Sequence, residues 1–433
     1  MKTAAMNLAP ALKADRREPP HDGRVPRVVI VGAGFGGMEA ARALARSPVE
    51  VVIIDEKNHH CFQPLLYQVA TAALSPADIA WPIRSMLRRQ DNARVMLARV
   101  IAVDQADRIV RTVSLPVPYD YLVLATGATH YYFGHDEWAK FAPGLKHIED
   151  ARRIRRRILL AFERAELAES EDERRRLMTF AIVGGGPTGV EMAGAIAEVA
   201  RHALKSDFRR IDPRASRIVL LEAGPRLLPS FPEHLARYAQ STLEQMGVEV
   251  LTSARVTGCD ENGVQLGNER IEACTSIWAA GVIASSASSW VDAERDRSGR
   301  VKVLPNLSID GAPDIFAIGD TALVLDKDEH PVPGIAPAAK QMGQYVGRLI
   351  DARVRGKPEP PPFAYRHYGE LATIGRKAAV VKLGRICLTG FVGWLFWSVA
   401  HIYFLIGVRN RFVVAFTWLW SYLTLQRGAR LIT

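Results

Sequence analysis

Two segments of this chain share one order of features: a short apolar run, the glycine pattern Gly-x-Gly-x-x-Gly, and then a helical pattern. The first segment is "RVPRVVIVGAGFGGMEAARALA" and the second is "MTFAIVGGGPTGVEMAGAIAEVA". The glycines are Gly32, Gly34 and Gly37 in the first copy and Gly184, Gly186 and Gly189 in the second. One such pattern alone is a weak match, but each copy here follows a predicted strand and opens a predicted helix. The repetition therefore predicts an α/β fold with two dinucleotide-binding units.

Each glycine pattern is followed by a second predicted strand that ends in a carboxylate. The stretch "VEVVIIDEKN" ends its apolar run at Asp55, and "SRIVLLEAGPR" ends its run at Glu222. Glycines let the backbone approach a pyrophosphate at the helix N-terminus, and the carboxylate accepts hydrogen bonds from ribose hydroxyls. We therefore expect two Rossmann-like domains, each with one dinucleotide.

Two further strand-and-turn patterns connect these domains. They are "YDYLVLATGATHYYFG", which runs into Thr126 and Gly127, and "IFAIGDTA", which runs into Gly319 and Asp320. In this order the four patterns resemble the two-domain flavin disulfide-reductase-like architecture. The resemblance implies that residues 125–127 lead into an inserted nicotinamide domain, that residues 277–282 lead back, and that Asp320 hydrogen-bonds the flavin's ribityl chain.

By the same resemblance the first site takes FAD, held non-covalently, and the second takes NADH. A carboxylate at Glu222 repels the 2′-phosphate of NADPH and so favours NADH. The nearby Arg226 softens this preference.

The chain's positive charge is concentrated at one end. The net charge of the 433 residues is +10, and residues 371–433 hold eight Lys or Arg and no Asp or Glu, which leaves +2 for the rest. A nucleic-acid partner would need its basic face on a recognisable binding module, and none is found in the sequence. The polar residues 1–25 are interpreted as a disordered leader, not a signal peptide.

The four cysteines, Cys61, Cys259, Cys274 and Cys387, are scattered. This spacing indicates a reducing compartment, without a disulfide framework or a metal site. Flavin disulfide reductases pass electrons to a cysteine pair after the first glycine motif, where this chain offers only Cys61. A small apolar role in the core is the preferred interpretation of Cys61. A soluble NADH peroxidase or oxidase that uses Cys61 remains an alternative, as does a flavin-containing NADH sensor or docking protein.

The C-terminal region is apolar, aromatic and basic. Residues 388–406 form one apolar segment, Arg409-Asn410-Arg411 is expected to interrupt it, and residues 412–425 form a second. Apolar segments bracketed by basic residues are typical of attachment to an anionic membrane surface. We expect interfacial helices; a membrane span of the first segment and a buried homodimer interface stay open.

The chain beyond the leader also resembles the type II NADH dehydrogenases, the single-subunit, non-proton-pumping NADH:quinone oxidoreductases of respiratory membranes. The resemblance rests on "HHCFQPLLYQVATAALSPADIAWPIR", "VGGGPTGVEMAGAIAE", "APAAKQMGQYVG", "LATIGRKAAVV" and "HIYFLIGVRNRFVVAFTWLWSYLT". It implies a peripheral enzyme on the cytoplasmic face of the inner membrane. That enzyme moves two electrons from NADH through FAD to a membrane quinone.

The resemblance also assigns roles to single residues. Glu191 is expected near the nicotinamide, and residues 336–343 are expected to form a helix at the flavin's pyrimidine end, beside the quinone mouth. Many relatives have Ala-Gln-x-Ala-x-Gln in that helix, whereas this chain has Pro337 in place of the first glutamine. Gln341 is retained, and Lys340 is expected to stabilise an anionic reduced flavin.

We therefore predict five regions. They are a leader (1–25), the first part of an FAD domain (26–150), an NADH domain (151–290), the second part of the FAD domain (291–365) and a membrane-anchoring domain (366–433).

Overall fold

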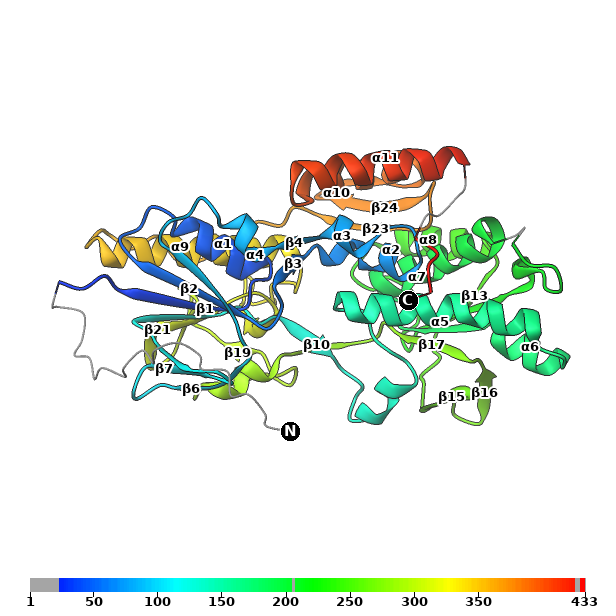
Figure 1. The fold of residues 1–433 in the computed structure, drawn as a ribbon, viewed down its shortest axis with the longest axis horizontal. Coiled ribbons are helices and arrows are strands. Elements are labelled where there is room, and N and C mark those ends of the chain that lie inside the picture. The colour runs from blue at the N-terminus through cyan, green and yellow to red at the C-terminus, as the bar shows by residue number, and fades with distance from the viewer. Residues whose placement is uncertain (1–22, 205–206, 425–428, 433) are drawn as a thin grey trace, which may run out of the picture.

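The computed structural model describes residues 23–204, 207–424 and 429–432. These residues form two α/β units side by side, with a C-terminal unit lying across both (Figure 1). The predicted leader lies outside the described residues except for its last three. One of these, Arg24, forms an ion pair with Asp120 of the first unit.

The first unit is built on a six-stranded sheet with the order β20-β21-β9-β1-β2-β5. Its strands are β1 (Arg27–Val31), β2 (Glu50–Asp55), β5 (Ala93–Leu97), β9 (Tyr121–Leu124), β20 (Ser308–Ile309) and β21 (Ala312–Ala317). All neighbours are parallel except β20 and β21. Residues 28–31 of the central strand β1 are at most 4% exposed, as expected for a parallel strand covered on both faces. The predicted strand ending at Asp55 is confirmed.

Helices α1 (Phe35–Ala43) and α9 (Ala336–Val354) pack together on one face of this sheet (Figure 1). They cross at glycines: a Cβ added to Gly343 would lie 2.1 Å from the carbonyl oxygen of Gly36. A small three-stranded sheet, β6 (Val100–Asp104), β7 (Ile109–Thr112) and β8 (Pro116–Pro118), lies on the other side.

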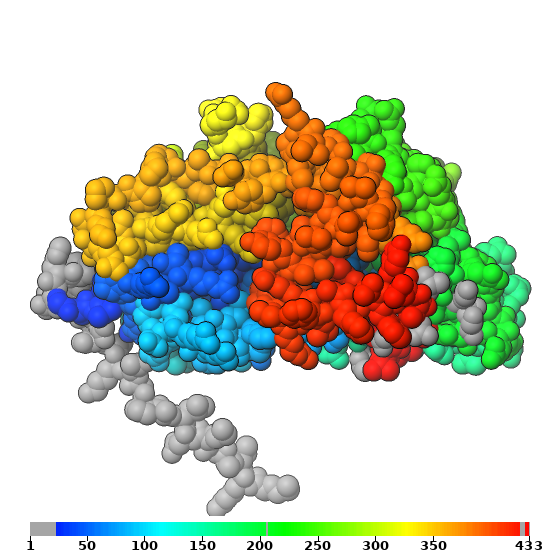
Figure 2. Space-filling model, turned by 90° about the horizontal axis from the view of Figure 1, so that it is seen from above, coloured from blue at the N-terminus to red at the C-terminus, as the bar shows by residue number. Residues whose placement is uncertain are grey.

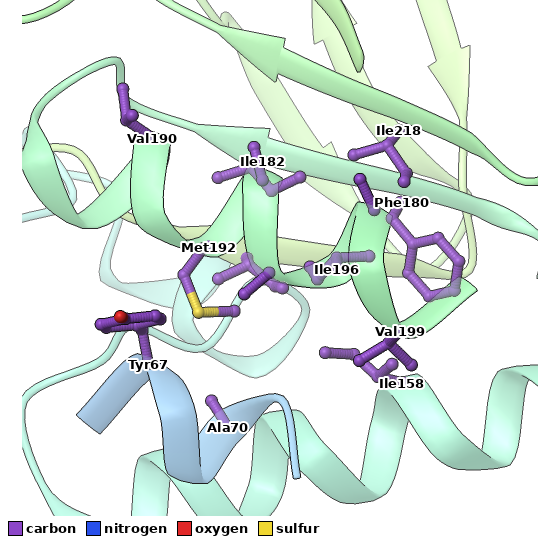
Figure 3. Close-up of a cluster of buried hydrophobic side chains, with 14 of the residues drawn as sticks. Tyr67, Ala70, Ile158, Phe180, Ile182, Val190, Met192, Ile196, Val199 and Ile218 are labelled. Carbon is purple, nitrogen blue, oxygen red and sulfur yellow. The ribbon is translucent and has the colours of Figure 1, made fainter. Parts of the chain in front are cut away.

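The second unit is built on a four-stranded parallel sheet with the order β13-β12-β11-β17. Its strands are β11 (Thr179–Val183), β12 (Arg217–Leu221), β13 (Val248–Leu251) and β17 (Thr275–Trp278), and its helices are α5 (Ile148–Leu167), α6 (Glu171–Leu177), α7 (Pro187–Glu198) and α8 (Glu233–Gln245). Figure 3 shows Met192 of α7 directed toward Tyr67, while Ile182 of the sheet lies on the other side of this helix. Helix α7 is thus buried between the sheet and α2 (Leu66–Ala70) of the first unit.

Short elements connect the two units. The two passages of the chain between them pair as an antiparallel ribbon, β10 (Ala128–His130) with β18 (Val282–Ala284). The remaining short elements are β3 (His59–Cys61), α3 (Pro76–Ile79), β4 (Ala80–Pro82), α4 (Ile83–Met86), β14 (Gly258–Asp260), β15 (Gly263–Leu266), β16 (Glu269–Glu272), β19 (Val301–Lys302) and β22 (Ala322–Leu323).

The C-terminal unit consists of a three-stranded antiparallel sheet and two helices. The strands are β23 (Glu370–Thr373), β24 (Ala379–Leu383) and β25 (Ile386–Leu388), and the helices are α10 (Gly390–Phe404) and α11 (Val408–Thr424). Trp397, Leu405 and Val414 join the same buried core as the second unit. Seen from above, this unit lies between the other two and contacts both (Figure 2).

The break between the two apolar segments lies earlier than the sequence predicted. Arg409, Asn410 and Arg411 do not interrupt the helices; they form the first turn of α11, where Asn410 is 1% exposed and donates to the carbonyl of Ala77. The chain turns instead at Gly407, whose φ is +82° and where a Cβ would lie 2.8 Å from the Trp81 ring. The close approach of Trp81 to Gly407, and not the polar triplet, therefore sets the boundary between the two helices. Among the described helices, none is long and apolar enough to cross a membrane.

The α1–α9 crossing gives a stability prediction. Gly343→Ala should lower the free energy of unfolding by about 1–3 kcal/mol, because the added methyl group meets backbone atoms of Gly36 and Ala40. Urea unfolding measures the loss. Arg348→Ala, on the exposed side of the same helix, is the matched control and should change it by less than about 0.5 kcal/mol. Equal effects of the two variants would contradict the packing argument.

Candidate functional site

The first glycine loop is open to a ligand at one position only. Gly32 has φ +100°, and a Cβ there would lie 2.4 Å from the carbonyl oxygen of Ala125. A Cβ on Gly37 would lie 1.9 Å from the carbonyl oxygen of Gly32. Gly34, in contrast, has nothing within 4 Å of the Cβ position. The fold therefore requires the first and third glycines, and the second leaves the space that a pyrophosphate needs.

Asp55 holds this loop from the neighbouring strand. Its Oδ2 accepts a hydrogen bond from the Ala33 amide at 2.6 Å, and its Oδ1 accepts one from the Lys57 amide at 2.7 Å. Burial raises the pKa of the Asp55 carboxyl, and these two amides partly oppose that shift. Each oxygen keeps a lone pair for a ribose hydroxyl.

The second loop repeats this geometry in the other unit. Gly184 has φ +112°, a Cβ on Gly189 would lie 1.8 Å from the carbonyl oxygen of Gly184, and Gly186 faces open space. Glu222 directly follows β12, and its carboxylate accepts from the amides of Gly185 and Gly224, both at 2.6 Å. The described residues thus contain two equivalent cradles for a dinucleotide.

Arg226 does not face Glu222. Its guanidinium donates to the carbonyl oxygens of Phe231 at 2.9 Å and Pro229 at 2.8 Å. Those bonds close the turn before α8 and occupy the side chain that was expected to soften the preference for NADH.

An open cavity of about 250 Å³ lies between the inter-unit ribbon and the start of α9. Its lining includes Gly319, Asp320, Ala338, Ala339 and Met342. Among the described residues, none donates a hydrogen bond to the Asp320 carboxylate; the nearest cation is Lys146, whose Nζ lies 3.8 Å from Oδ2. A partly buried carboxylate without a donor, facing a cavity, suits a ligand rich in hydroxyl groups such as a ribityl chain.

The hydroxyl of Thr126 lies where the chain leaves the first unit. It is 2.6 Å from the hydroxyl of Ser285 and 3.2 Å from that of Thr321, which also accepts from the Gly127 amide at 3.0 Å. These bonds join both linker passages to the turn that carries Asp320. Thr126 and Gly127 therefore lie beside the cavity and already have protein partners.

Lys340 and Gln341 are neighbours on α9 but face different surroundings. The Lys340 ammonium lies 5.5 Å from the ring centre of Phe35 and 5.2 Å from that of Phe404 on α10. Burial lowers its pKa. Gln341 exchanges two hydrogen bonds with the main chain of Arg366, both at 2.9 Å, and so ties α9 to the segment before β23.

Glu191 lies on the first turns of α7, next to the C-terminal unit. Its Oε1 is 3.5 Å from the Thr373 amide, the one hydrogen bond found for this carboxyl among the described residues. Burial raises its pKa to about 8, and the Thr373 amide opposes this only weakly. Glu191 therefore holds a proton at neutral pH and can give it up in the mildly alkaline range.

The polar residues of the "HHC" and "SPAD" stretches have structural contacts. His60 is buried, its Nδ1–H donates to the Ala33 carbonyl at 2.8 Å, and burial lowers its pKa to about 4. Asp78 caps α3 by accepting from the Ser75 amide.

Burial raises the pKa of the Cys61 thiol to about 12, so it is not a thiolate at neutral pH. No group of three or more His, Cys, Asp or Glu side chains suited to a metal ion occurs in the described part of the chain.

A second, small cavity of about 60 Å³ lies between α2, α7 and the C-terminal helices. Its walls include Trp394, Trp397, Trp418 and Tyr67, and it also touches Thr373, the neighbour of Glu191. Neither this cavity nor Lys146 is predictable from the sequence. An apolar, aromatic segment with basic residues indicates membrane contact as readily as a cavity wall, and no pattern marks a lysine in a turn.

Family models match most of the chain. Residues 26–343 match the model described as pyridine nucleotide-disulphide oxidoreductase, and residues 367–425 match the NDH2 C-terminal domain. The chain is 44% identical over 422 residues to the type II NADH:quinone oxidoreductase Ndh of Mycobacterium tuberculosis, covering 94% of this chain and 90% of that protein. It is 43% identical to NdhA of the same organism, covering 96% and 91%.

Solved structures share the fold. The NDH2 of Plasmodium falciparum in complex with NADH has a TM-score of 0.86 at 22% identity, over 95% of this chain and all of that one. The sulfide:quinone oxidoreductase of Aquifex aeolicus has a TM-score of 0.69 at 19% identity, over 89% and 92%. The predicted two-domain α/β architecture is therefore confirmed.

The second cradle gives a prediction on nucleotide choice. Glu222→Gln should lower kcat/KM for NADH roughly tenfold, because a charged hydrogen bond to the ribose is lost. The same variant should raise kcat/KM for NADPH, because the charge that repels its phosphate is gone. Steady-state kinetics with both nucleotides measure the ratio, with Glu244→Gln on exposed α8 as the control. An unchanged ratio would remove Glu222 from the nucleotide site.

Proposed function

Because the chain belongs to the type II NADH:quinone oxidoreductases, we propose that it transfers two electrons from NADH through FAD to a membrane quinone, without pumping protons. One contact carries the proposal beyond family membership. Lys340 lies on α9, the helix that lines the cavity through Ala338, Ala339 and Met342, and it contacts Phe404 on the apolar helix α10. The helix beside the cavity thus touches the apolar helices, which supports direct access of a lipid-soluble acceptor without a thiol relay.

The residues present fit a flavin. Gly32, Gly34 and Gly37 leave room for a pyrophosphate, Asp55 accepts from the adenosine ribose, and Asp320 accepts from the ribityl chain. A pyrophosphate loop of this kind favours FAD over a mononucleotide. When bound, the flavin supplies the two-electron chemistry, and the protein binds, orients and adjusts charge.

The second cradle is proposed to bind NADH. Gly184, Gly186 and Gly189 form the loop, and Glu222 accepts from the ribose hydroxyls. Two carbonyl oxygens hold the Arg226 guanidinium in the turn before α8, so the Glu222 carboxylate, which repels a 2′-phosphate, is the feature that favours NADH over NADPH.

Glu191 is proposed to hold a proton at the junction of the three units. A neutral carboxylic acid beside the electron-transfer site can donate to a quinone oxygen that gains charge. Lys340 is proposed to supply positive charge from α9, where its ammonium is partly buried and close to the rings of Phe35 and Phe404. Gln341 keeps the position of α9 through Arg366.

The outer face of α10 and α11 is proposed to lie in the membrane surface. Its exposed apolar side chains include Phe391, Val392, Leu395, Val399, Tyr403, Val408, Phe412, Phe416, Leu419, Trp420 and Leu423. Basic residues accompany this face and acidic ones are absent from residues 371–433, which supports an anionic surface. We place the protein on the cytoplasmic face of the inner membrane as a peripheral enzyme.

The function is tested with Phe412→Ser/Phe416→Ser. NADH should bleach the flavin absorbance of both the variant and the wild type, and a short-tailed soluble quinone should then restore it. With long-tailed quinone in anionic vesicles, the variant should be at least about tenfold slower, because two exposed rings no longer enter the bilayer.

Leu167→Ser, which removes an equally exposed apolar side chain on α5, is the control and should be as fast as wild type. If NADH does not bleach the flavin absorbance, the proposed reaction is contradicted. A changed oligomeric state with unchanged vesicle activity would instead make this face a dimer interface.

Glu191→Gln tests the proton role. Wild-type quinone reduction should fall as pH rises through about 8, because Glu191 loses its proton there. The variant should be slower at pH 7, by about tenfold or more, and should lack this alkaline decline. Folding stability gives a second readout. Glu191 keeps its proton in the folded chain up to about pH 8, whereas an unfolded chain loses it near pH 4.5, so the wild type should lose stability as pH rises from about 4.5 to about 8. The variant should therefore gain stability relative to wild type over this range. Parallel pH profiles would exclude Glu191.

A further inference from the structure

Lys146, in the second unit, contacts Asp320, which lines the cavity assigned to the flavin. It lies in the turn before α5, and its Nζ is 3.8 Å from Oδ2 of Asp320, which belongs to the first unit. Both side chains are largely buried, with 19% and 23% of their surfaces exposed. The pair therefore bridges the two units at the cavity wall, in surroundings where charges are poorly screened.

The main chain fixes the position of Lys146. Its amide donates to Oδ2 of Asp150 at 3.0 Å, and the His147 amide donates to the same oxygen at 2.9 Å. Asp150 is also 3.3 Å from Nε2 of His130, which lies on the linker strand β10. Asp150 of α5 thus holds the main chain of Lys146, and Asp150 is itself in contact with the linker.

The Asp320 carboxylate, in contrast to Lys146, is not held by hydrogen bonds from the described residues. Its oxygens receive no hydrogen bond from the described residues, and Gly334 leaves one side open, because a Cβ there would lie 3.0 Å from Oδ1. At 3.8 Å the ammonium is too far for a strong hydrogen bond, so both oxygens stay available to a ligand. Lys146 compensates the charge of Asp320 without using its acceptors.

We propose that Lys146 is a positioning residue that neutralises Asp320 beside the flavin and thereby favours the reduced cofactor. The inference rests on the proposed function. A reduced flavin carries more negative charge than an oxidised one, and an uncompensated carboxylate at the ribityl chain repels that charge. No bond forms or breaks at Lys146; its effect is electrostatic and geometric.

The test uses the full chain with its flavin and the variants Lys146→Met and Lys146→Arg. At the potential where the wild-type flavin is half reduced, measured against a redox dye, Lys146→Met should shift the oxidised-to-reduced ratio roughly tenfold toward oxidised. Lys146→Arg should restore the ratio to near the wild-type value, because it restores the charge.

Two further variants separate charge from structure. Lys302→Met removes a lysine from the exposed pair with Glu294 and should leave the ratio unchanged. The double variant Lys146→Met/Asp320→Asn should return the ratio toward wild type, because the uncompensated carboxylate is gone. If Lys146→Met does not retain flavin, the ratio is measured in Lys146→Gln and Lys146→Arg instead, and Lys146→Gln should shift it toward oxidised while Lys146→Arg does not.

The outcomes divide clearly. A wild-type chain that carries flavin, together with an unchanged ratio in Lys146→Met, overturns this inference and leaves the proposed function intact. Failure of the double variant to recover also overturns it. A wild-type chain that binds no flavin overturns the proposed function itself.

Discussion

A carboxylate at the end of one strand holds the glycine loop at the end of the neighbouring strand, and this contact occurs once in each nucleotide-binding unit. Asp55 accepts from the Ala33 amide and Glu222 from the Gly185 amide, both at 2.6 Å. The bond fixes the loop against the sheet, so that the helix N-terminus behind it faces outward with unsatisfied amides. The side chain that shapes the loop is also the one that can recognise a ribose. Loop geometry and ligand selection therefore cannot be changed independently.

The elements around these loops were predictable because they follow local rules. An apolar run, a glycine that must adopt φ of +100° or more, and a carboxylate in register with the loop all lie within about 40 residues. Strands β1, β2 and β11 and the position of Glu222 after β12 agree with the sequence analysis. The two open positions, Gly34 and Gly186, needed the structure, because only the surroundings show which glycine the fold requires and which one leaves space for a ligand.

Features set by contacts between distant segments were not predictable. The turn between α10 and α11 lies at Gly407 because Trp81, more than 300 residues earlier, approaches too closely for a side chain. The orientation of Lys146 depends on Asp150 and on His130 of the linker, and that of Gln341 depends on Arg366. No periodicity or motif encodes such pairs. They form where the three units meet, which is also where the candidate site lies.

Two ionisable groups at this junction carry no uncompensated charge before any electron arrives. Burial raises the pKa of Glu191 to about 8 and so keeps it protonated, while Lys146 balances Asp320 at 3.8 Å. Lys340 differs, because its ammonium lies near the rings of Phe35 and Phe404 and forms no ion pair with a carboxylate among the described residues. In the proposed reaction, the electrons bring negative charge into this region and the quinone carries it away. A transferable proton on Glu191 and the two lysines favour that entry.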